Sequence, residues 1–297
     1  MAVETVAIMS PGDMGHSVGR ALRESGLDVV VCLAGRSART RCLSGEAALR
    51  EVPDLETLVQ EADLILSILV PSESVPAAEK VAAAMRTTRA APAYADCNAI
   101  SPGTARQVDA VITGAGGRYI DAGIIGGPPG SDEVTRFYAS GPHESVLSVL
   151  DGRGILVRQL GGDTGRASGI KMCYASLTKG TAALHAAALI TAESLGLSQN
   201  LYTELGESQA AKLKAMQNIR GLSTKAFRWV GEMEEIARTY EEAGVTPYFH
   251  LGAANIFRII ADSSIGHERP ETIDSNRTLE QTINLLAEGL IQADDDS

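Results

Sequence analysis

The sequence has few of the residues that mark several large classes of protein. Only four of its 297 residues are cysteine, aromatic residues make up 4%, and tryptophan occurs once. The cysteines (Cys32, Cys42, Cys97 and Cys173) form no C-x-x-C pair, which favours reduced thiols over a disulfide framework. Cys32 and Cys173 lie in apolar segments, so we expect both to be small core residues. The five histidines show no metal-ligand spacing, and we predict no metal site.

Basic runs and long apolar runs are also missing. Lys and Arg number 26 against 37 Asp and Glu, so the formal net charge is -11, and no basic stripe could neutralise a nucleic-acid backbone. The most apolar segments, residues 64–70 and 181–197, are too short or too interrupted to supply the about 20 apolar residues that cross a bilayer. No basic region precedes the first apolar run. These absences predict a cytoplasmic protein that binds neither nucleic acid nor membrane.

A change of pattern divides the chain near its middle. Before residue 161, short β-branched runs alternate with helical stretches, which predicts an α/β fold with a Rossmann-type doubly wound parallel sheet. The candidate strands span residues 3–9, 28–33, 63–69, 93–96, 118–123, 135–140 and 155–160. Later, apolar residues recur at helical spacing over residues 164–195, 200–218, 228–242, 248–264 and 277–292. We predict a dinucleotide-binding domain over residues 1–162 and an all-helical domain over residues 163–297.

A glycine turn follows the first predicted strand and precedes a helix. Residues 10–19 read SPGDMGHSVG. Gly12 would let the backbone approach a pyrophosphate, Gly15 would let the helix pack on the strand, and the helix N-terminus would attract the phosphate charge. Ser10 stands where the usual G-x-G-x-x-G has its first glycine. We assign Ser10, Gly12, Asp13, Met14 and Gly15 to cofactor binding, with a plain strand-to-helix turn as the alternative.

The end of the second predicted strand distinguishes NAD from NADP. An acidic residue there would hold the ribose 2′-hydroxyl of NAD, but residues 34–41 (AGRSARTR) contain no carboxylate. Arg36, Arg39 and Arg41, beside Ser37 and Thr40, suit a 2′-phosphate, which arginine binds through forked, charge-assisted hydrogen bonds. We therefore predict NADP, with NAD less favoured, and assign Arg36, Ser37 and Arg39 to it. A solvated basic turn is the alternative.

The glycine turn and four later segments resemble, in the same order, the β-hydroxyacid dehydrogenase superfamily, which includes 3-hydroxyisobutyrate dehydrogenases, 6-phosphogluconate dehydrogenase and imine reductases. The family's apolar strand ending in proline is similar to residues 63–71 (DLILSILVP), and its D-x-S-T-x-S-P to residues 96–102 (DCNAISP). Its substrate-binding D-A-P-V-S-G-G is similar to residues 121–127 (DAGIIGG), and its interdomain G-x-G-x-x-x-K-x-x-N-N to residues 165–175 (GRASGIKMCYA). The resemblance implies that further cofactor contacts come from Leu69, Val70, Pro71 and Asn98.

Lys171 occupies the position of the lysine that acts as acid or base in the family. A free lysine titrates near about 10.4, so a lysine that works near neutrality needs a desolvated environment. Ser168, Lys171, Tyr174 and Thr178 recur on one helix face, so we add Tyr174 and Thr178 to the substrate site. An exposed lysine near a helix start is the alternative for Lys171. Lys179, further along the helix, is expected to be solvated.

The remaining substrate-site residues follow from the resemblance, and some depart from it. The set is completed by Asn98, Ile125, Gly126 and Gly127. Ile125 stands where the family has a substrate-binding serine, and Tyr174 with Ala175 replaces the two asparagines after the lysine. These departures resemble a divergent branch with a 6-phosphogluconate-dehydrogenase-like C-terminal domain, and they argue against 6-phosphogluconate and simple 3-hydroxyisobutyrate as substrates.

These residues predict an NADP-dependent oxidoreductase that acts on a small molecule, namely a hydroxy acid or a related alcohol or ketone. An imine reductase on the same scaffold is an alternative, although that group usually replaces the lysine. A catalytically silent NADP-binding sensor is another, because of the departures at Ser10, Ile125 and the missing asparagines. The Ala- and Gly-rich stretch at residues 178–195 predicts a homodimer through the helical domain, although the same small residues could serve packing within one chain.

Overall fold

The computed structural model describes residues 3–295 and consists of two compact units. The first unit ends at Tyr174 and the second begins at Ala175, a division that falls inside helix α6 (Arg166–Ser194). The last strand ends at Gln159 and α6 begins at Arg166, while the domain boundary between residues 162 and 163 stays a prediction. The first unit also takes in the opening turns of α6.

The first unit is built around one sheet of eight strands in the order β3-β2-β1-β4-β5-β6-β7-β8. The strands are β1 (Thr5–Ile8), β2 (Asp28–Cys32), β3 (Arg50–Val52), β4 (Leu64–Ser67), β5 (Ala93–Asp96), β6 (Arg118–Ile125), β7 (Arg136–Ser140) and β8 (Leu156–Gln159). Strands β1 to β6 are parallel, which confirms the predicted fold class.

One edge of the sheet departs from the parallel pairing of the other strands. Strand β7 pairs antiparallel with β6, and β8 runs parallel to β7. Residues 126–135 between β6 and β7 are too few for the crossover, usually a helix, that a parallel pair requires. The chain therefore turns back on itself directly after β6.

Three further details differ from the sequence predictions. Strand β3 was missed because two of its three residues are charged and exposed, and it forms through backbone pairing with β2. The expected helix over residues 200–218 is broken into α7 (Ser198–Ser208), α8 (Ala210–Met216) and the 3-10 helix η3 (Gln217–Thr224). Cys173 is exposed on α6 and Cys32 is half-buried, whereas Cys97 is the buried cysteine.

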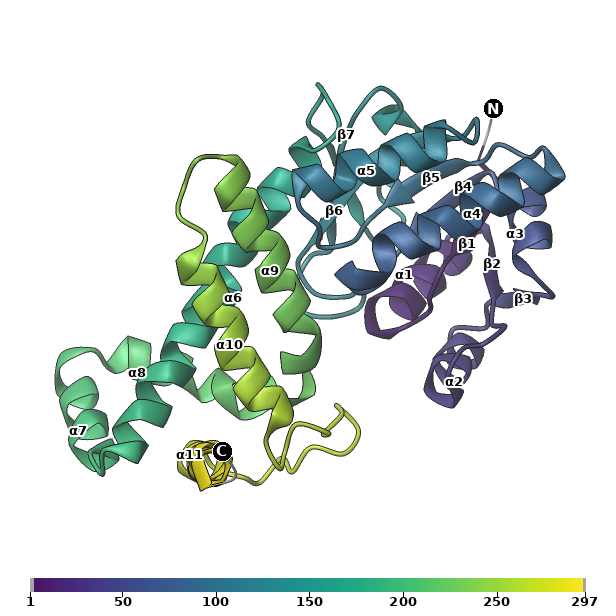
Figure 1. The fold of residues 1–297 in the computed structure, drawn as a ribbon. Coiled ribbons are helices and arrows are strands. Elements are labelled where there is room, and N and C mark those ends of the chain that lie inside the picture. The colour runs from purple at the N-terminus through teal and green to yellow at the C-terminus, as the bar shows by residue number, and fades with distance from the viewer. Residues whose placement is uncertain (1–2, 296–297) are drawn as a thin grey trace. The chain divides into compact units, whose positions relative to one another are not determined.

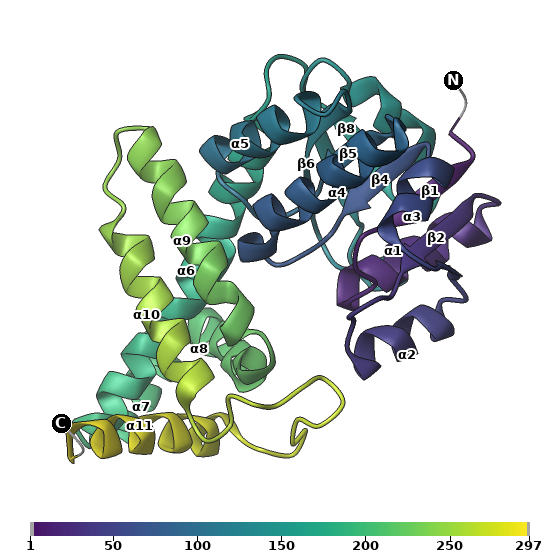
Figure 2. The ribbon, with the colours of Figure 1, turned by 45° about the vertical axis from the view of Figure 1, so that its right-hand side comes forward.

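Helices cover both faces of the sheet. On one face, α3 (Leu55–Glu61), α4 (Ser74–Thr88) and α5 (Pro102–Thr113) pack on strand residues such as Ala7 and Ile65. On the other, α1 (Asp13–Glu24) and η2 (Glu144–Leu150) pack on Val6, Ile8 and Leu66. Successive strand residues point to opposite faces, so a strand covered on both faces, such as β4, is apolar at successive positions from Leu64 to Leu66. Figures 1 and 2 show α4 and α5 side by side over one face.

The second unit is helical, as predicted. It contains the rest of α6, then α7, α8, η3, α9 (Ala226–Glu242), α10 (Tyr248–Asp262) and α11 (Leu279–Asp295). Helices α9 and α10 lie side by side in both views (Figures 1 and 2), and Trp229 meets Phe257 edge-to-face with ring centroids 5.2 Å apart. Within residues 3–295, no helix has the length and apolar character needed to cross a bilayer.

Buried polar groups tie the helices of the second unit together. The hydroxyl of Ser176 on α6 lies 2.8 Å from the Tyr240 hydroxyl and 2.9 Å from Nε2 of His250, so it links α6, α9 and α10. Burial lowers the pKa of His250, so this histidine is neutral near pH 7. Lys179 forms a buried ion pair with Glu232. The expectation that Lys179 is solvated was therefore wrong, because its partner comes from a helix 53 residues later.

Candidate active site at the carboxyl edge of the sheet

The glycine turn lies between the end of β1 and the start of α1. A Cβ atom at Gly15 would collide with the carbonyl oxygen of Ser10, so only glycine fits there. Gly12 is the N-cap of α1, and no atom lies within 4 Å of the place where its Cβ would be. The first N–H groups of a helix lack intrahelical partners, and no described side chain caps this one. The turn can therefore receive a pyrophosphate on its open side.

A cavity of about 360 Å³ opens next to this turn, beyond the ends of β2 and β4. Its charged side chains are Arg36, Asp54, Glu73 and Lys80. Its apolar lining consists of Met9, Cys32, Ala34, Leu55, Leu58, Leu69 and Ala77. An apolar lining with a few charged groups can hold a flat uncharged ring, with Arg36 beside it for an anion.

The arginines after β2 have distinct partners in the first unit. Arg36 donates to the carbonyl oxygen of Met9 at 3.0 Å, and Arg41 donates to the carbonyl oxygen of Leu33 at 2.6 Å. Arg39 forms an ion pair with Asp13, the first residue of α1, at 2.6 Å. Ser37 caps α2 (Ala38–Glu46), because its hydroxyl accepts a hydrogen bond from the Thr40 N–H at 3.2 Å. Residues 34–41 contain no carboxylate of their own, and the carboxylate that pairs with Arg39 belongs to Asp13 in the glycine turn.

Asn98 joins the ends of β4 and β5. Its Oδ1 accepts from the N–H of Leu69 at 2.5 Å, and its Nδ2 donates to the hydroxyl of Ser67 at 3.0 Å. Leu69 lies in the cavity wall, and Val70 and Pro71 follow it, with Pro71 opening the short 3-10 helix η1 (Pro71–Glu73). Because Asn98 is buried and uses both amide atoms on the protein, its clearest role is to position the β4 loop.

Four buried polar residues form a row across the carboxyl edge of the sheet. Ser67, Asp96, Asp121 and Ser140 are successive register partners on β4, β5, β6 and β7. Burial raises the pKa of Asp96 to about 6, although hydrogen bonds from Ser74 and from the Asn98 N–H act in the opposite direction. The two carboxylates are kept in the interior by hydrogen bonds, because a buried charge without them is costly.

Asp121 caps the N-terminus of α6. Its Oδ2 accepts the N–H groups of Gly165 and Ala167 at 2.9 Å and of Ser168 at 3.2 Å, and also the Ser140 hydroxyl at 2.7 Å. Its Oδ1 accepts the Ser168 hydroxyl at 2.5 Å. A carboxylate at a helix N-terminus also interacts favourably with the helix dipole. The sequence motifs placed Asp121 in a substrate segment without a role of its own. The cap could not be predicted from sequence, because the N–H groups that Asp121 accepts lie 44 to 47 residues later in the chain.

Lys171 is held at the same edge by β6. Its Nζ donates a hydrogen bond to the carbonyl oxygen of Ile124 near the end of β6, and its side chain is half-buried. A Cβ atom at Gly123 would lie 2.9 Å from both the Ala167 carbonyl oxygen and the Lys171 Cβ. Glycine is therefore required where α6 crosses β6. Three residues of β6 set the position of the lysine: Asp121 caps α6, Gly123 lets the helix approach, and Ile124 accepts the hydrogen bond from Nζ.

The other residues predicted for the substrate site have mixed surroundings. Ile125 is buried, and its two following glycines shape the return to β7. Gly126 has φ +105°, and a Cβ there would collide with the Val134 carbonyl, while the carbonyl oxygen of Gly127 accepts the Thr135 hydroxyl at 2.6 Å.

The helical members of that set are more open. Tyr174 is 46% exposed on α6. Thr178 belongs to the second unit, where it is exposed and its hydroxyl donates to the Ala175 carbonyl at 3.3 Å. Their roles with substrate stay predictions.

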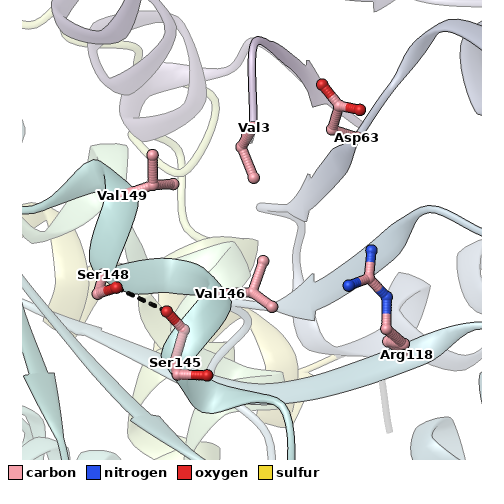
Figure 3. Close-up of a pocket in the computed structure, with 7 residues that line it drawn as sticks. All are labelled: Val3, Asp63, Arg118, Ser145, Val146, Ser148 and Val149. Atoms are coloured by element: carbon pink, nitrogen blue, oxygen red, sulfur yellow. Dashed lines mark hydrogen bonds between the residues drawn. The ribbon is translucent and has the colours of Figure 1, made fainter. Parts of the chain in front are cut away.

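A second hollow lies at the opposite, amino edge of the sheet. Figure 3 shows its lining, in which Asp63 and Arg118 stand beside Val3, Val146 and Val149. Asp63 is occupied there, because its Oδ2 accepts the N–H groups of Glu4 and Thr5. Ligands of open α/β sheets bind beyond the carboxyl ends of the strands, so this hollow of about 270 Å³ is not part of the candidate site.

Comparison with known protein families gives two matches. Residues 5–151 match the family described as the NAD binding domain of 6-phosphogluconate dehydrogenase. Residues 192–260 match a domain of unknown function, DUF1932. The first match covers the glycine turn, the arginine turn and the cavity, and the second lies within the helical unit.

Individual relatives are similar over most of the chain. An uncharacterized 28.5 kDa protein of Methanothermus fervidus is 24% identical over 231 residues, which are 78% of this chain and 84% of that protein. A solved structure of a conserved protein of unknown function, described as similar to 3-hydroxyacid dehydrogenases, is 26% identical, with a TM-score of 0.62 over 87% of this chain and 97% of its own. The 3-hydroxyisobutyrate dehydrogenase of Salmonella typhimurium is 20% identical, with a TM-score of 0.68 over 94% of this chain and 99% of its own.

Proposed function

Because the chain joins a 6-phosphogluconate-dehydrogenase-type NAD-binding domain to a DUF1932 domain, we propose that it is an NADP-dependent oxidoreductase. It transfers a hydride between the nicotinamide and a hydroxy acid or a related alcohol or ketone. Lys171 is its acid and base. The observation that carries this proposal is the placement of Lys171 by β6 at the carboxyl edge of a sheet that has an uncapped glycine turn on the same edge.

The first unit has the features that a dinucleotide needs. The open side of Gly12 and the uncapped start of α1 suit the pyrophosphate. The cavity next to them suits the adenosine half, and Arg36 in its wall suits a 2′-phosphate. We therefore propose NADP as the preferred cofactor, since the arginine turn offers no carboxylate of its own to a ribose hydroxyl.

Lys171 supplies the proton chemistry. A bound nicotinamide gives or accepts the hydride. During reduction, the ammonium of Lys171 gives a proton to the carbonyl oxygen of the substrate, and during oxidation the neutral amine takes the hydroxyl proton. The bond to the Ile124 carbonyl and the contact at Gly123 hold Nζ in place before a substrate arrives, which lowers the cost of reaching the reactive geometry.

The test is NADPH oxidation with a panel of keto acids, ketones and cyclic imines. We expect turnover of at least one carbonyl compound, and we expect Lys171→Met to lower kcat by at least about a hundredfold because the proton donor is lost. Lys214→Met is the matched control, since Lys214 is an exposed lysine of α8, and it should keep full turnover.

The same panel separates the alternatives. Turnover of imines alone would favour an imine reductase. NADPH binding without turnover of any compound would favour a sensor. Unchanged turnover in Lys171→Met would remove the assignment of the acid and base.

A further inference from the structure

The three arginines after β2 differ in what they face. Arg36 lines the 360 Å³ cavity and donates a hydrogen bond to the backbone carbonyl of Met9. Arg41 bonds to the Leu33 carbonyl and lies 3.5 Å from a Glu51 carboxylate oxygen. Arg39 does not line the cavity, and its guanidinium reaches the glycine turn through the 2.6 Å ion pair with Asp13.

Asp13 occupies a sensitive position. It follows Gly12 directly and is the first residue of α1, where the helix N-terminus would receive a pyrophosphate. A carboxylate there has the same sign of charge as the pyrophosphate and competes with it for the helix dipole. Unless a cation neutralises it, Asp13 opposes the binding of any dinucleotide, with or without a 2′-phosphate.

We infer that Arg39 is the counter-ion of Asp13 and that the 2′-phosphate is recognised by Arg36. The inference rests on the proposed function, namely that the first unit binds NADP. It changes the role of one residue of the arginine turn: Arg39 supports the binding of both dinucleotides equally, because it acts on the pyrophosphate end. Arg36 discriminates between NADP and NAD, because it lies in the wall of the cavity, where it can bind the 2′-phosphate that NAD lacks.

The pair has the geometry of a neutralising contact. The two side chains are 35% and 41% exposed, so solvent screens the pair and its contribution to folding is small. Its effect on a ligand is larger than its effect on stability, because the pyrophosphate places two negative charges beside the same carboxylate. A structural role alone would leave dinucleotide affinity unchanged.

The experiment measures the Kd of NADP⁺ and of NAD⁺ by isothermal titration calorimetry at one fixed salt concentration. The proteins are wild type, Arg39→Ala, Arg36→Ala, Asp13→Asn and the double variant Asp13→Asn with Arg39→Ala. Arg50→Ala is the matched control, because Arg50 is also an exposed arginine paired with carboxylates, Asp28 and Glu61, but lies in β3. Thermal unfolding of each variant verifies that it is folded.

We expect Arg39→Ala to weaken NADP⁺ and NAD⁺ by the same factor, about fivefold to tenfold. Arg36→Ala should weaken NADP⁺ by about tenfold to a hundredfold and leave NAD⁺ within twofold. Adding Asp13→Asn to Arg39→Ala should restore both affinities, because the charge that needed a partner is gone. Arg50→Ala should change neither.

Any of three results would overturn the inference while NADP⁺ still binds the wild type. One is a loss in Arg39→Ala that is confined to NADP⁺, which would make Arg39 a phosphate ligand. The second is a double variant that binds no better than Arg39→Ala, and the third is an Arg39→Ala variant with unchanged affinities. A wild-type protein that binds neither dinucleotide overturns the proposed function and this inference with it.

Discussion

The two units of the molecule differ in how completely they bury their apolar residues. Outside α6, the described part of the first unit exposes only Val70 and Val134 among its large apolar side chains. The second unit exposes Leu177, Leu184, Leu195, Leu197, Phe227, Val245, Tyr248, Phe249 and Leu251. A sheet covered by helices on both faces closes its own core, whereas the helices of the second unit keep apolar side chains at the surface. Exposed apolar patches of this kind mark interaction surfaces.

Buried polar groups show the opposite distribution. In the first unit four of them, Ser67, Asp96, Asp121 and Ser140, form one row at the edge that holds the candidate site. In the second unit they form separate contacts between helices, such as Ser176 with His250 and Lys179 with Glu232. The comparison indicates that buried polar groups of the first unit concentrate at the edge of the candidate site, whereas those of the second unit connect helices to one another.

The largest expected effect tests the polar row. Asp121→Ala removes the acceptor of three backbone N–H groups at the start of α6. The N–H of Ala167 keeps the Ser140 hydroxyl as an acceptor, but those of Gly165 and Ser168 are left buried without a partner. We expect a loss of about 4 kcal/mol in the free energy of unfolding, measured by urea denaturation, because each unpaired buried group costs about 1–3 kcal/mol. Ser140→Ala, which removes one bond to the same carboxylate, should cost about 1 kcal/mol. A change below 1 kcal/mol in Asp121→Ala would show that the cap does not hold α6.

The next effect concerns pH and the neighbouring carboxylate. Burial raises the pKa of Asp96 from its ordinary value of 3.8 to about 6 in the folded protein. The folded state binds this proton more tightly than the unfolded state, so the contribution to stability is complete below pH 3.8 and is lost as pH rises through 6. Wild type should therefore lose up to about 3 kcal/mol from this group between pH 4 and pH 7.

Asp96→Asn removes this dependence and supplies its control. The Ser74 hydroxyl that donates to the carboxylate can turn to accept from the asparagine amide. We compare the denaturant midpoints of the two proteins from pH 4 to pH 7. As pH rises, the midpoint of wild type should fall relative to that of Asp96→Asn, because only wild type loses the stability contributed by the protonated carboxyl. Parallel curves would mean that Asp96 is ionised across this range.

The smallest expected effect tests an exposed apolar face of α6, a helix that runs from the first unit into the second. Tyr174, Leu177 and Leu184 recur at spacings of three and seven along α6 and therefore share one face of that helix. We propose that a second copy of this chain covers this face in a homodimer, because an uncharged stripe is complementary to itself across a two-fold axis.

Light scattering with gel filtration measures this association. Wild type should have twice the 31.1 kDa mass of one chain. Leu177→Glu with Leu184→Glu should weaken association by about a hundredfold, because charges would be buried at the interface. Thr203→Glu, at an exposed polar position of α7, is the matched control and should remain a dimer. A monomeric wild type would assign the stripe to another role.

Local sequence was enough to locate most of the fold and the proposed cofactor turn. Apolar runs located all strands except β3, and helical spacing located the helices of the second unit, because both patterns follow from the repeat of the backbone itself. The glycine turn was equally readable, since the steric need at Gly15 arises from Ser10, five residues away. The assignment of Lys171 depended on motif resemblance rather than on any local rule.

The partners of the charged residues were beyond the reach of such patterns. Asp13 and Arg39 are 26 residues apart, and Asp121 lies 46 residues before Ala167, whose N–H it accepts. Lys179 was expected to be solvated, but in the structure it forms a buried ion pair with Glu232. The sequence gives the charge of each side chain, but the energy of that charge depends on its burial and on the groups that folding brings beside it. For this reason the backbone pattern could be predicted from one sequence, while the electrostatics of the site required the assembled sheet and helices.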